Sequence, residues 1–456
     1  MFVKDKSFYK TLIFIALPIA LQNLLSNGLN LADSIMVSRV SETAVSSVSL
    51  AGQPNFILNL VFFGIGSGAA VLTSQYFGQG GKNDIKAINK ILGMAVRFSV
   101  IISFVFFIIA EFFPLQIMLL FSKDLTIANE GVVYLQIVAF SYVVSAVTAT
   151  YMIIVRSVEK VMVALIVSSS ALFIDTILSY ILIYGKLGFP KMGIAGAALG
   201  TLIAKFIEFI LMLIHAKFFN KTLAFKFKYI FSYDSFIFKK FLSYSLPVVL
   251  NETFWGVGIS FQAAIMGNLN GDAIAAYSIV SLVLNFCLVF LVGLGNASAV
   301  IIGKIIGSGN EDFARKAAKT FTFLSILVGV VTGILVISSI PFINYLYPLS
   351  DTARTYLNTI LIIAATYSII ISFNVVNVIG IFRGGGDTKF SLILDIASLW
   401  ICSIVFGVIG AHILKFSVPI VYIILKSDEI VKLFLGIYRM KSGKWLKNLI
   451  QQDVIS

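Results

Sequence analysis

Residues 64–80 read GIGSGAAVLTSQYFGQG, and residues 293–309, offset by 229, read GLGNASAVIIGKIIGSG. Other matches keep the same order along the chain. LPIALQ (17–22) pairs with LPVVLN (246–251) at an offset of 229, and IMVSRVSETAVSSVSL (35–50) pairs with IMGNLNGDAIAAYSIV (265–280) at 230. Arg156 and Arg383 are 227 residues apart. The nearly constant offset predicts that the chain consists of two homologous halves.

The composition indicates a membrane protein. Of 456 residues, 59% are hydrophobic and 12% are charged, whereas a soluble domain is about half apolar and about a quarter charged. Apolar runs long enough for a membrane-spanning helix of about 20 residues recur along the whole chain. Helices satisfy their own backbone hydrogen bonds in lipid. We therefore expect an all-α polytopic membrane protein.

Charged and Gly/Pro breaks divide the apolar runs into twelve predicted transmembrane helices, six in each half. An even number of spans per repeat makes the two pseudo-symmetric lobes parallel, related by an axis along the membrane normal. The expected domains are a first lobe (1–220), a cytoplasmic connecting loop (221–236) and a second lobe with a cytoplasmic tail (237–456). The spans are expected at 11–37, 44–77, 86–112, 127–156, 160–185, 192–218, 237–267, 272–306, 313–345, 351–382, 386–414 and 416–438.

Basic residues predict the orientation of the chain. Counting span ends, 27 of the 34 Lys and Arg residues lie on the side of the two termini. The positive-inside rule places that side in the cytoplasm. The same distribution explains the formal charge of +13 by contact with anionic membrane lipid, so no nucleic-acid partner is expected. The Lys, Ile and Phe content, without a signal peptide, favours a bacterial inner (plasma) membrane.

We expect neither an enzyme nor a tightly bound cofactor, because the sequence contains no motif typical of either. Cys287 and Cys402 lie in apolar runs, and the two histidines are far apart, so no metal-ligand spacing appears. The glycines of GIGSG (64–68) are interpreted as allowing close helix packing. Gly384 to Gly386 are interpreted as a turn, with Asp387 capping the next helix.

Acidic residues inside the predicted spans are the candidate functional groups. A charge at mid-bilayer costs about 2.5 kcal/mol or more, and such residues normally mark an ion or substrate pathway. Asn30 and Asp33 are three residues apart and share a helix face, although Asn30 could also serve only a helix–helix hydrogen bond. The candidates are Asp33, Asp175, Glu208 and Glu252, together with a span-twelve group of Lys426, Asp428, Glu429 and Lys432 that is expected to form structural ion pairs.

The motifs together resemble the MATE (multidrug and toxic compound extrusion) family. They are Pro18 of the first predicted span with LADSIMV (31–37) after it, the glycine-rich stretch 64–84, GFPKMGIAGAALGT (188–201), LPVVLNETFWGVG (246–258) and FRGGGDTKFS (382–391). The resemblance implies a V-shaped twelve-helix fold with a cavity between the lobes. It also implies a cation site at Asp33. The family usually has Asn and Asp where this chain has Asp175 and Ser179, so the acid has moved one helical turn.

Further site residues follow from the resemblance. Thr201 matches a family threonine that points at the first-lobe cluster, and Glu208 could join the cavity or pair with Lys205. In the second lobe, Asn251 and Glu252 follow Pro247, which frees a backbone carbonyl. These oxygens could hold Na⁺ or a cationic drug.

The expected function is that of a secondary active antiporter. It would export cationic or amphipathic small molecules in exchange for H⁺ or Na⁺ by alternating access, as a monomer. If Na⁺ is the coupling ion, Asp33 and Asp175 are the expected ligands. The alternative is a flippase for lipid-linked oligosaccharides, which would require Arg or Lys facing the cavity.

Overall fold

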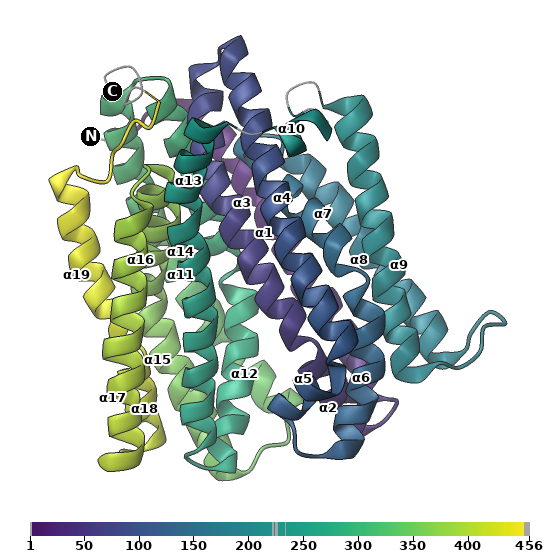
Figure 1. Ribbon diagram of the computed structural model, residues 1–456. Helices are drawn as coiled ribbons and strands as arrows, with labels where there is room; N and C mark the ends of the chain where they lie inside the picture. Colours follow the sequence, from purple (N-terminus) through teal and green to yellow (C-terminus); the bar gives the residue numbers. More distant parts are fainter. Residues whose placement is uncertain (1, 221–222, 224–226, 233, 451–456) are drawn as a thin grey trace. The chain divides into compact units, whose positions relative to one another are not determined.

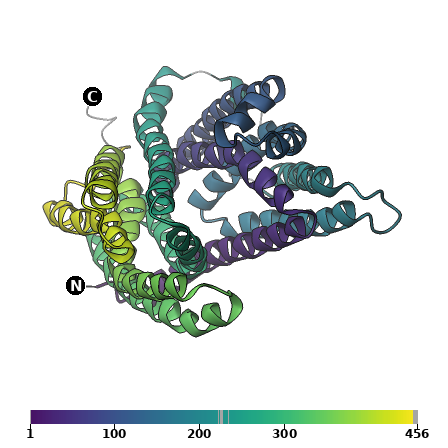
Figure 2. The ribbon, with the colours of Figure 1, turned by 90° about the horizontal axis from the view of Figure 1, so that it is seen from below.

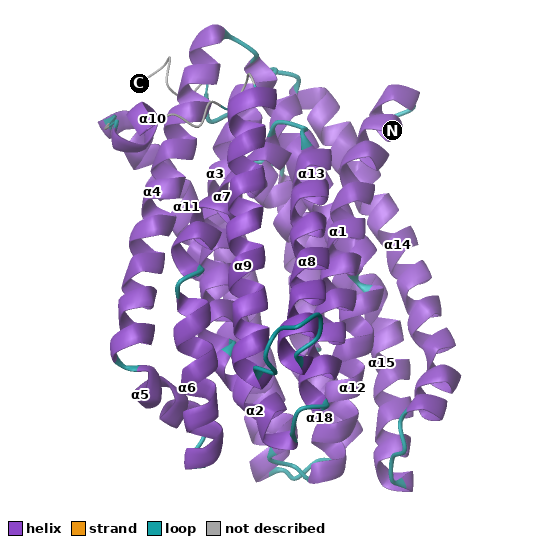
Figure 3. Ribbon diagram, turned by 90° about the vertical axis from the view of Figure 1, so that its right-hand side faces the viewer, coloured by secondary structure: helices purple, strands orange, loops and turns teal. Residues whose placement is uncertain are grey.

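The computed structural model describes residues 2–220, 223, 227–232 and 234–450, and almost all of them are helical (Figures 1 and 3). The first half contains α1 (Lys6–Ser38), α2 (Glu42–Ala51), α3 (Gln53–Gln79), α4 (Lys82–Phe112), α5 (Pro114–Phe121), α6 (Leu125–Ala139), α7 (Tyr142–Ser157), α8 (Val161–Tyr184), α9 (Gly193–Ile214), the π-helix η1 (His215–Phe219) and α10 (Phe227–Phe231). The second half contains α11 (Ser235–Gly267), α12 (Gly271–Cys287), α13 (Val289–Gly307), α14 (Glu311–Leu346), α15 (Asp351–Val375), η2 (Val376–Phe382), α16 (Thr388–Ala397), η3 (Ser398–Val405), α17 (Phe406–Val408), η4 (Ile409–Ile413), α18 (Val418–Leu425) and α19 (Ser427–Ser442).

Each of the twelve predicted spans coincides with one helix or with consecutive helices, which confirms the predicted fold class. Within the described ranges, nine helices are long and apolar enough to cross a membrane. The pair α6 and α7, bent by 56°, makes a tenth. The remaining two predicted spans are α11 and the pair α18 and α19. α11 is 33 residues long but carries Asn251, Glu252 and Gln262, and the last pair is interrupted at Lys426.

The chain forms two compact units. We call residues 21–73 and 82–245 the first-lobe unit, and residues 1–20, 74–81 and 246–456 the second-lobe unit. Helices α1, α3 and α11 each contribute residues to both units. The lobe boundaries expected from the repeat stay a prediction. Within the expected loop 221–236, the structure describes the short helix α10, whereas 221, 222, 224–226 and 233 lie outside the described residues.

Close glycine contacts hold the first-lobe unit together. A Cβ atom at Gly66 would lie 2.8 Å from Ile153 Cδ1, and one at Gly68 would overlap Ser245 Cα. The predicted role of the GIGSG glycines in helix packing is confirmed at these two positions. On α9, a Cβ atom at Gly200 would lie 2.5 Å from Ser179 Oγ of α8. This close approach brings the polar residues of α8 and α9 together. The α8–α9 connection projects from the unit (Figure 2).

The second-lobe unit contains the glycine turn before α16. Gly386 has φ +85°, as the predicted turn requires. The prediction that Asp387 caps α16 is wrong, because its side chain makes no capping hydrogen bond. Instead, its Oδ2 accepts from Arg439 Nε at 2.7 Å and its Oδ1 accepts from Lys447 Nζ at 2.5 Å. The buried carboxylate therefore ties the C-terminal residues to this turn.

Candidate functional site

Helices α8 and α9 of the first-lobe unit position the buried Asp175. Its side chain is on α8 and is only 8% exposed. Ser179 Oγ, one turn along α8, donates to Asp175 Oδ1 at 3.2 Å. Thr201 Oγ1 on α9 donates to the same oxygen, also at 3.2 Å. The structure thus joins three of the predicted residues in one cluster, although Ser179 carries no charge.

Asp33 lies next to this cluster. It is half-buried on α1, hydrogen-bonds the Thr176 side chain and interacts electrostatically with Asp175. Its Oδ1 is buried and accepts no hydrogen bond from the described residues. Asn30 is exposed, and its backbone carbonyl accepts from Ser34 Oγ at 2.9 Å. Asp33 and Asp175 therefore form the core of the cluster, and we call these two residues the carboxylate pair.

Tyr134 on α6 is a neighbour of the carboxylate pair that the sequence reasoning missed. Its side chain hydrogen-bonds that of Thr201, and it interacts electrostatically with both Asp33 and Asp175. One tyrosine in an apolar span resembles any other, so no signal in the sequence distinguished Tyr134. Only the packing of α6 against α9 brings it to the site.

Glu208 forms a second polar group in the same unit. Its Oε2 accepts from Lys205 Nζ at 3.0 Å, and its Oε1 accepts from Ser168 Oγ at 2.9 Å. All three residues line a cavity of about 220 Å³. The predicted pairing of Glu208 with Lys205 therefore occurs, whereas its place in a cavity between the lobes stays a prediction, because the cavity that it lines belongs to the first-lobe unit. The other lining residues are Gln22, Asn59, Phe62, Phe63, Ser145, Ala149, Met152, Ile153 and Arg156.

In the second-lobe unit, the predicted pair Asn251 and Glu252 contacts an arginine. Arg383 Nη1 donates to Glu252 Oε1 at 2.6 Å, and the Arg383 side chain is 2% exposed. With its amide oriented to satisfy both neighbours, Asn251 accepts from Arg383 and donates to Asp395 Oδ2 at 3.1 Å. The carboxylate of Glu252 is therefore neutralised by a residue 131 positions away. The sequence predicted a cation at this acid but did not identify the arginine as that cation.

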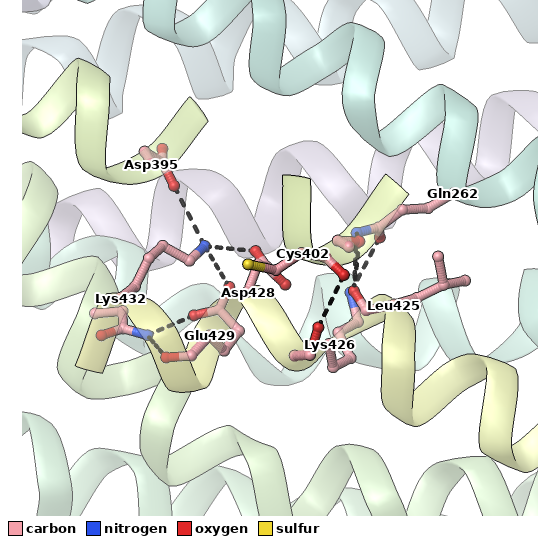
Figure 4. Close-up of polar contacts among 11 residues, drawn as sticks. Gln262, Asp395, Cys402, Leu425, Lys426, Asp428, Glu429 and Lys432 are labelled. Atoms are coloured by element: carbon pink, nitrogen blue, oxygen red, sulfur yellow. Dashed lines mark hydrogen bonds and ion pairs between the residues drawn. The ribbon is translucent and has the colours of Figure 1, made fainter. Parts of the chain in front are cut away.

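Lys432 is the centre of the ion pairs on α19 (Figure 4). Its Nζ lies 2.9 Å from Asp428 Oδ2 and 2.7 Å from Glu429 Oε1, which confirms the predicted pairing inside this group. It also lies 3.3 Å from Asp395 Oδ1. Asn374 donates to Glu429 Oε2 at 2.7 Å.

Lys426 and Asp395 also belong to the polar residues of the second-lobe unit. Lys426 of the predicted group donates to Gln262 Oε1 at 3.3 Å instead of to an acid. Asp395 was missed among the intramembrane acids. Its signal was available, because it is a carboxylate in the apolar run SLILDIAS of a predicted span. Together these residues form one connected network of charges, from Glu252 to Glu429.

The donor chemistry of the carboxylate pair suits a proton or a hard cation. Carboxylate and hydroxyl oxygens are the ligands that such cations prefer. The buried Asp33 Oδ1 is an acceptor without a donor among the described residues. In that same part of the chain, no group of three or more His, Cys, Asp or Glu residues is arranged to hold a metal ion. Asp33 and Asp175 would therefore need hydroxyl or carbonyl oxygens to complete a Na⁺ site.

Comparison with known proteins agrees with this architecture. The chain is 26% identical over 454 residues to the "Uncharacterized transporter YisQ" of Bacillus subtilis, covering 97% of this chain and 96% of that protein. It is 26% identical over 410 residues to the "Probable multidrug resistance protein NorM" of Pasteurella multocida, covering 87% and 85%.

A solved structure has the same fold. It is described as the "Outward-facing conformation of a multidrug resistance MATE family transporter of the MOP superfamily". The TM-score is 0.82 at 19% identity, with 95% of this chain and 96% of the other covered. The MatE family model matches residues 18–181 and 249–409, one segment in each half of the repeat. The chain therefore belongs to the MatE family of membrane transporters.

Proposed function

We propose that this protein exports cationic or amphipathic small molecules, including drugs, in exchange for H⁺ or Na⁺. The observation that carries the proposal is the carboxylate pair of the first-lobe unit. Asp33 and Asp175 interact electrostatically, and Asp33 Oδ1 is buried without a donor in the described part of the chain. The names of the relatives, among them a probable multidrug resistance protein, support drugs as substrates.

The chemistry of exchange follows from competition for negative charge. An organic cation is held by the two carboxylates, because the low dielectric of the lobe strengthens their attraction. A proton or Na⁺ that binds to the pair neutralises part of this charge, and two adjacent carboxylates favour such uptake because they repel each other. The organic cation then loses its counter-charge and dissociates. Exchange between two membrane faces requires alternating access of the site.

The test is transport by the purified chain in proteoliposomes. A Na⁺ gradient and a pH gradient are imposed separately, and movement of the fluorescent cation ethidium is followed. We expect one of the gradients to drive transport, and Asp33→Asn to reduce the rate at least about tenfold. Asp351→Asn, at the exposed start of α15, is the matched control and should transport normally. Transport by Asp33→Asn at the wild-type rate under the active gradient would refute the proposal.

A further inference from the structure

The connection between α8 and α9 is a short, ordered loop. It consists of residues 185–192, GKLGFPKM, and we call it the α8–α9 loop. Backbone hydrogen bonds fix its shape. Phe189 N donates to Lys186 O at 3.1 Å, and Met192 N donates to Leu182 O of α8 at 3.0 Å. The loop therefore has a defined conformation that presents the same residues at its tip.

The tip of the loop exposes two apolar side chains. Leu187 is 82% exposed, and Phe189 is 53% exposed. Leu187 also has φ +54°, in the left-handed region that a residue with a Cβ atom adopts only at a cost. Glycine or asparagine would make the same turn without exposing an apolar group. A large apolar residue at a strained and exposed position indicates a function for its side chain.

The direction of the loop places it at the membrane interface. It projects sideways from α8 and α9 and does not continue along their axes (Figures 1 and 2). In the same unit, α2 and α6 extend further in the direction in which α8 ends (Figures 1 and 3). Both α8 and α9 are long and apolar enough to cross a membrane. A segment that leaves two such helices sideways, short of the ends of their neighbours, runs along the lipid headgroups.

The charges of the loop complement a phospholipid surface. Lys186 and Lys191, on either side of the apolar tip, are both exposed, and the loop contains no acidic residue. A lysine can hold its ammonium group at the level of the phosphates while apolar neighbours lie deeper. Lysines beside exposed leucine and phenylalanine are typical of segments that lie in the plane of an anionic membrane surface.

We propose that the α8–α9 loop is a lipid anchor, whose apolar tip, Leu187 and Phe189, inserts into the border of the acyl chains. Its two lysines bind the phosphates of anionic phospholipids. Insertion removes the apolar tip from water, which compensates the strain at Leu187. The anchor holds the adjoining ends of α8 and α9 at one depth in the bilayer. This inference goes beyond the proposed function and does not depend on it, because the lipid contact requires no transport.

The test is the depth of a probe in nanodiscs that contain the full chain with Cys287 and Cys402 replaced by Ala. The fluorophore NBD is attached at Leu187→Cys or Phe189→Cys. Phosphatidylcholine with a nitroxide on its acyl chain near the headgroup quenches a probe that lies in lipid. We expect quenching at both positions to be at least about twofold stronger than at Ser417→Cys, an exposed polar position before α18. Quenching at either position no stronger than at Ser417→Cys would overturn the inference.

A second variant separates the apolar side chain from the turn. Leu187→Asn keeps the left-handed conformation, which asparagine adopts readily, but removes the apolar group. It should weaken the quenching of the probe at Phe189→Cys. Leu125→Asn, at an exposed leucine of α6 in the same unit, is the matched control and should leave this quenching unchanged. Equal quenching in Leu187→Asn and in the control would contradict the role of Leu187 as an anchor.

The two lysines are tested by the charge of the lipid. Quenching of the probe at Leu187→Cys is compared in phosphatidylcholine nanodiscs with and without phosphatidylglycerol. Phosphatidylglycerol should strengthen the quenching, and about 1 M NaCl should cancel the gain by screening. Lys186→Gln combined with Lys191→Gln should also cancel the gain, while quenching in phosphatidylcholine alone persists. Lys123→Gln combined with Lys415→Gln, at exposed lysines outside the loop, should retain the gain.

Two results would exclude anionic lipid as the partner of the lysines. One is the absence of any effect of phosphatidylglycerol, and the other is an effect that survives the exchange of both loop lysines. A docking site for another protein is the alternative for an exposed apolar tip. In a nanodisc with one copy of the chain, the probes of such a site would stay in water and emit like the probe at Ser417→Cys, which would overturn the lipid anchor.

Discussion

At the scale of single residues, the important distinction is between charges that are compensated by the chain and charges that are not. Glu252 and Asp428 have cationic partners at hydrogen-bond distance. Asp175 has two hydroxyl donors and interacts electrostatically with Lys205, but among the described residues no cation contacts it directly, and the buried Oδ1 of Asp33 has no donor there. Acids without a cation in direct contact are the ones free to exchange one. This distinction favours the carboxylate pair over the second-lobe network as the exchange site.

Thr201 is expected to influence the affinity of the carboxylate pair for the coupling ion. A hydrogen bond to a charged group contributes about 1.5–3 kcal/mol. Thr201→Ala removes one of the two hydroxyls on Asp175 Oδ1 and should change the half-saturating concentration of the coupling ion by about tenfold or more. Thr201→Ser should restore it. Thr359→Ala is the control, because that hydroxyl donates only to its own helix at Thr355. Ion-dependent transport in proteoliposomes measures the effect, and an unchanged half-saturation in Thr201→Ala would contradict the prediction.

Lys432 is expected to be structural. Lys432→Ala would leave the carboxylates of Asp395, Asp428 and Glu429 without their common cation. Removing one partner of a buried ion pair costs about 3–5 kcal/mol, so the unfolding temperature in detergent should fall markedly. Lys441→Ala, in the exposed last turn of α19, is the matched control and should be neutral. A Lys432→Ala protein as heat-stable as the control variant would show that the network tolerates the loss.

At the scale of elements, the contact between α8 and α9 decides the geometry of the first-lobe cluster. Gly196 and Gly200 of α9 face the backbone of α8, where a Cβ atom would lie 2.6 Å from Leu182 C or 2.9 Å from Ser179 N. Small residues allow such close approach of helices in membranes. The approach lets Thr201 of one helix and Ser179 of the other donate to the same carboxylate oxygen.

Gly200→Ala should disturb both packing and site. Overpacking a tight contact costs about 1–3 kcal/mol, so the unfolding temperature should fall. Because α9 would shift away from Ser179, transport should fall as well. Gly28→Ala is the control, since a Cβ atom at this α1 position meets nothing within 4 Å. Thermal unfolding and ethidium transport are measured on both variants. Equal stability of the two variants would contradict the prediction that a side chain at position 200 disturbs the packing of α9 against α8.

At the scale of the whole molecule, the distribution of basic residues still predicts the orientation of the chain. The two ends of the last predicted span, formed by α18 and α19, test it. In a variant with Cys287 and Cys402 replaced by Ala, single cysteines are placed at the exposed Ser417 and Ser442. The positive-inside rule predicts that a membrane-impermeant maleimide added to intact cells labels Ser417→Cys only. Ser442→Cys should react after permeabilisation. The opposite pattern would contradict cytoplasmic termini.

Much of the fold could be predicted from the sequence because the hydropathy of each segment and the internal repeat can be read without knowing any contact. Hydropathy is a local property, so twelve spans could be recognised even where α6 and α7 bend by 56°. Polar positions in α11 lowered its hydropathy without moving its ends far from those expected. The repeat, visible in 64–80 and 293–309, established two related halves without any knowledge of contacts.

The site was only partly predictable because each buried charge is compensated by residues of other helices, whose positions the sequence does not show. The hydropathy pattern predicts that Asp33, Asp175 and Glu252 lie inside the membrane. The pairing of Glu252 with Arg383, 131 residues away, becomes visible only in the three-dimensional structure. Likewise, only packing brought Tyr134 to the carboxylate pair. The physical reason is that hydrophobic burial follows the composition of each segment, whereas the free energy of a buried charge depends on which opposite charge lies within a few ångströms of it.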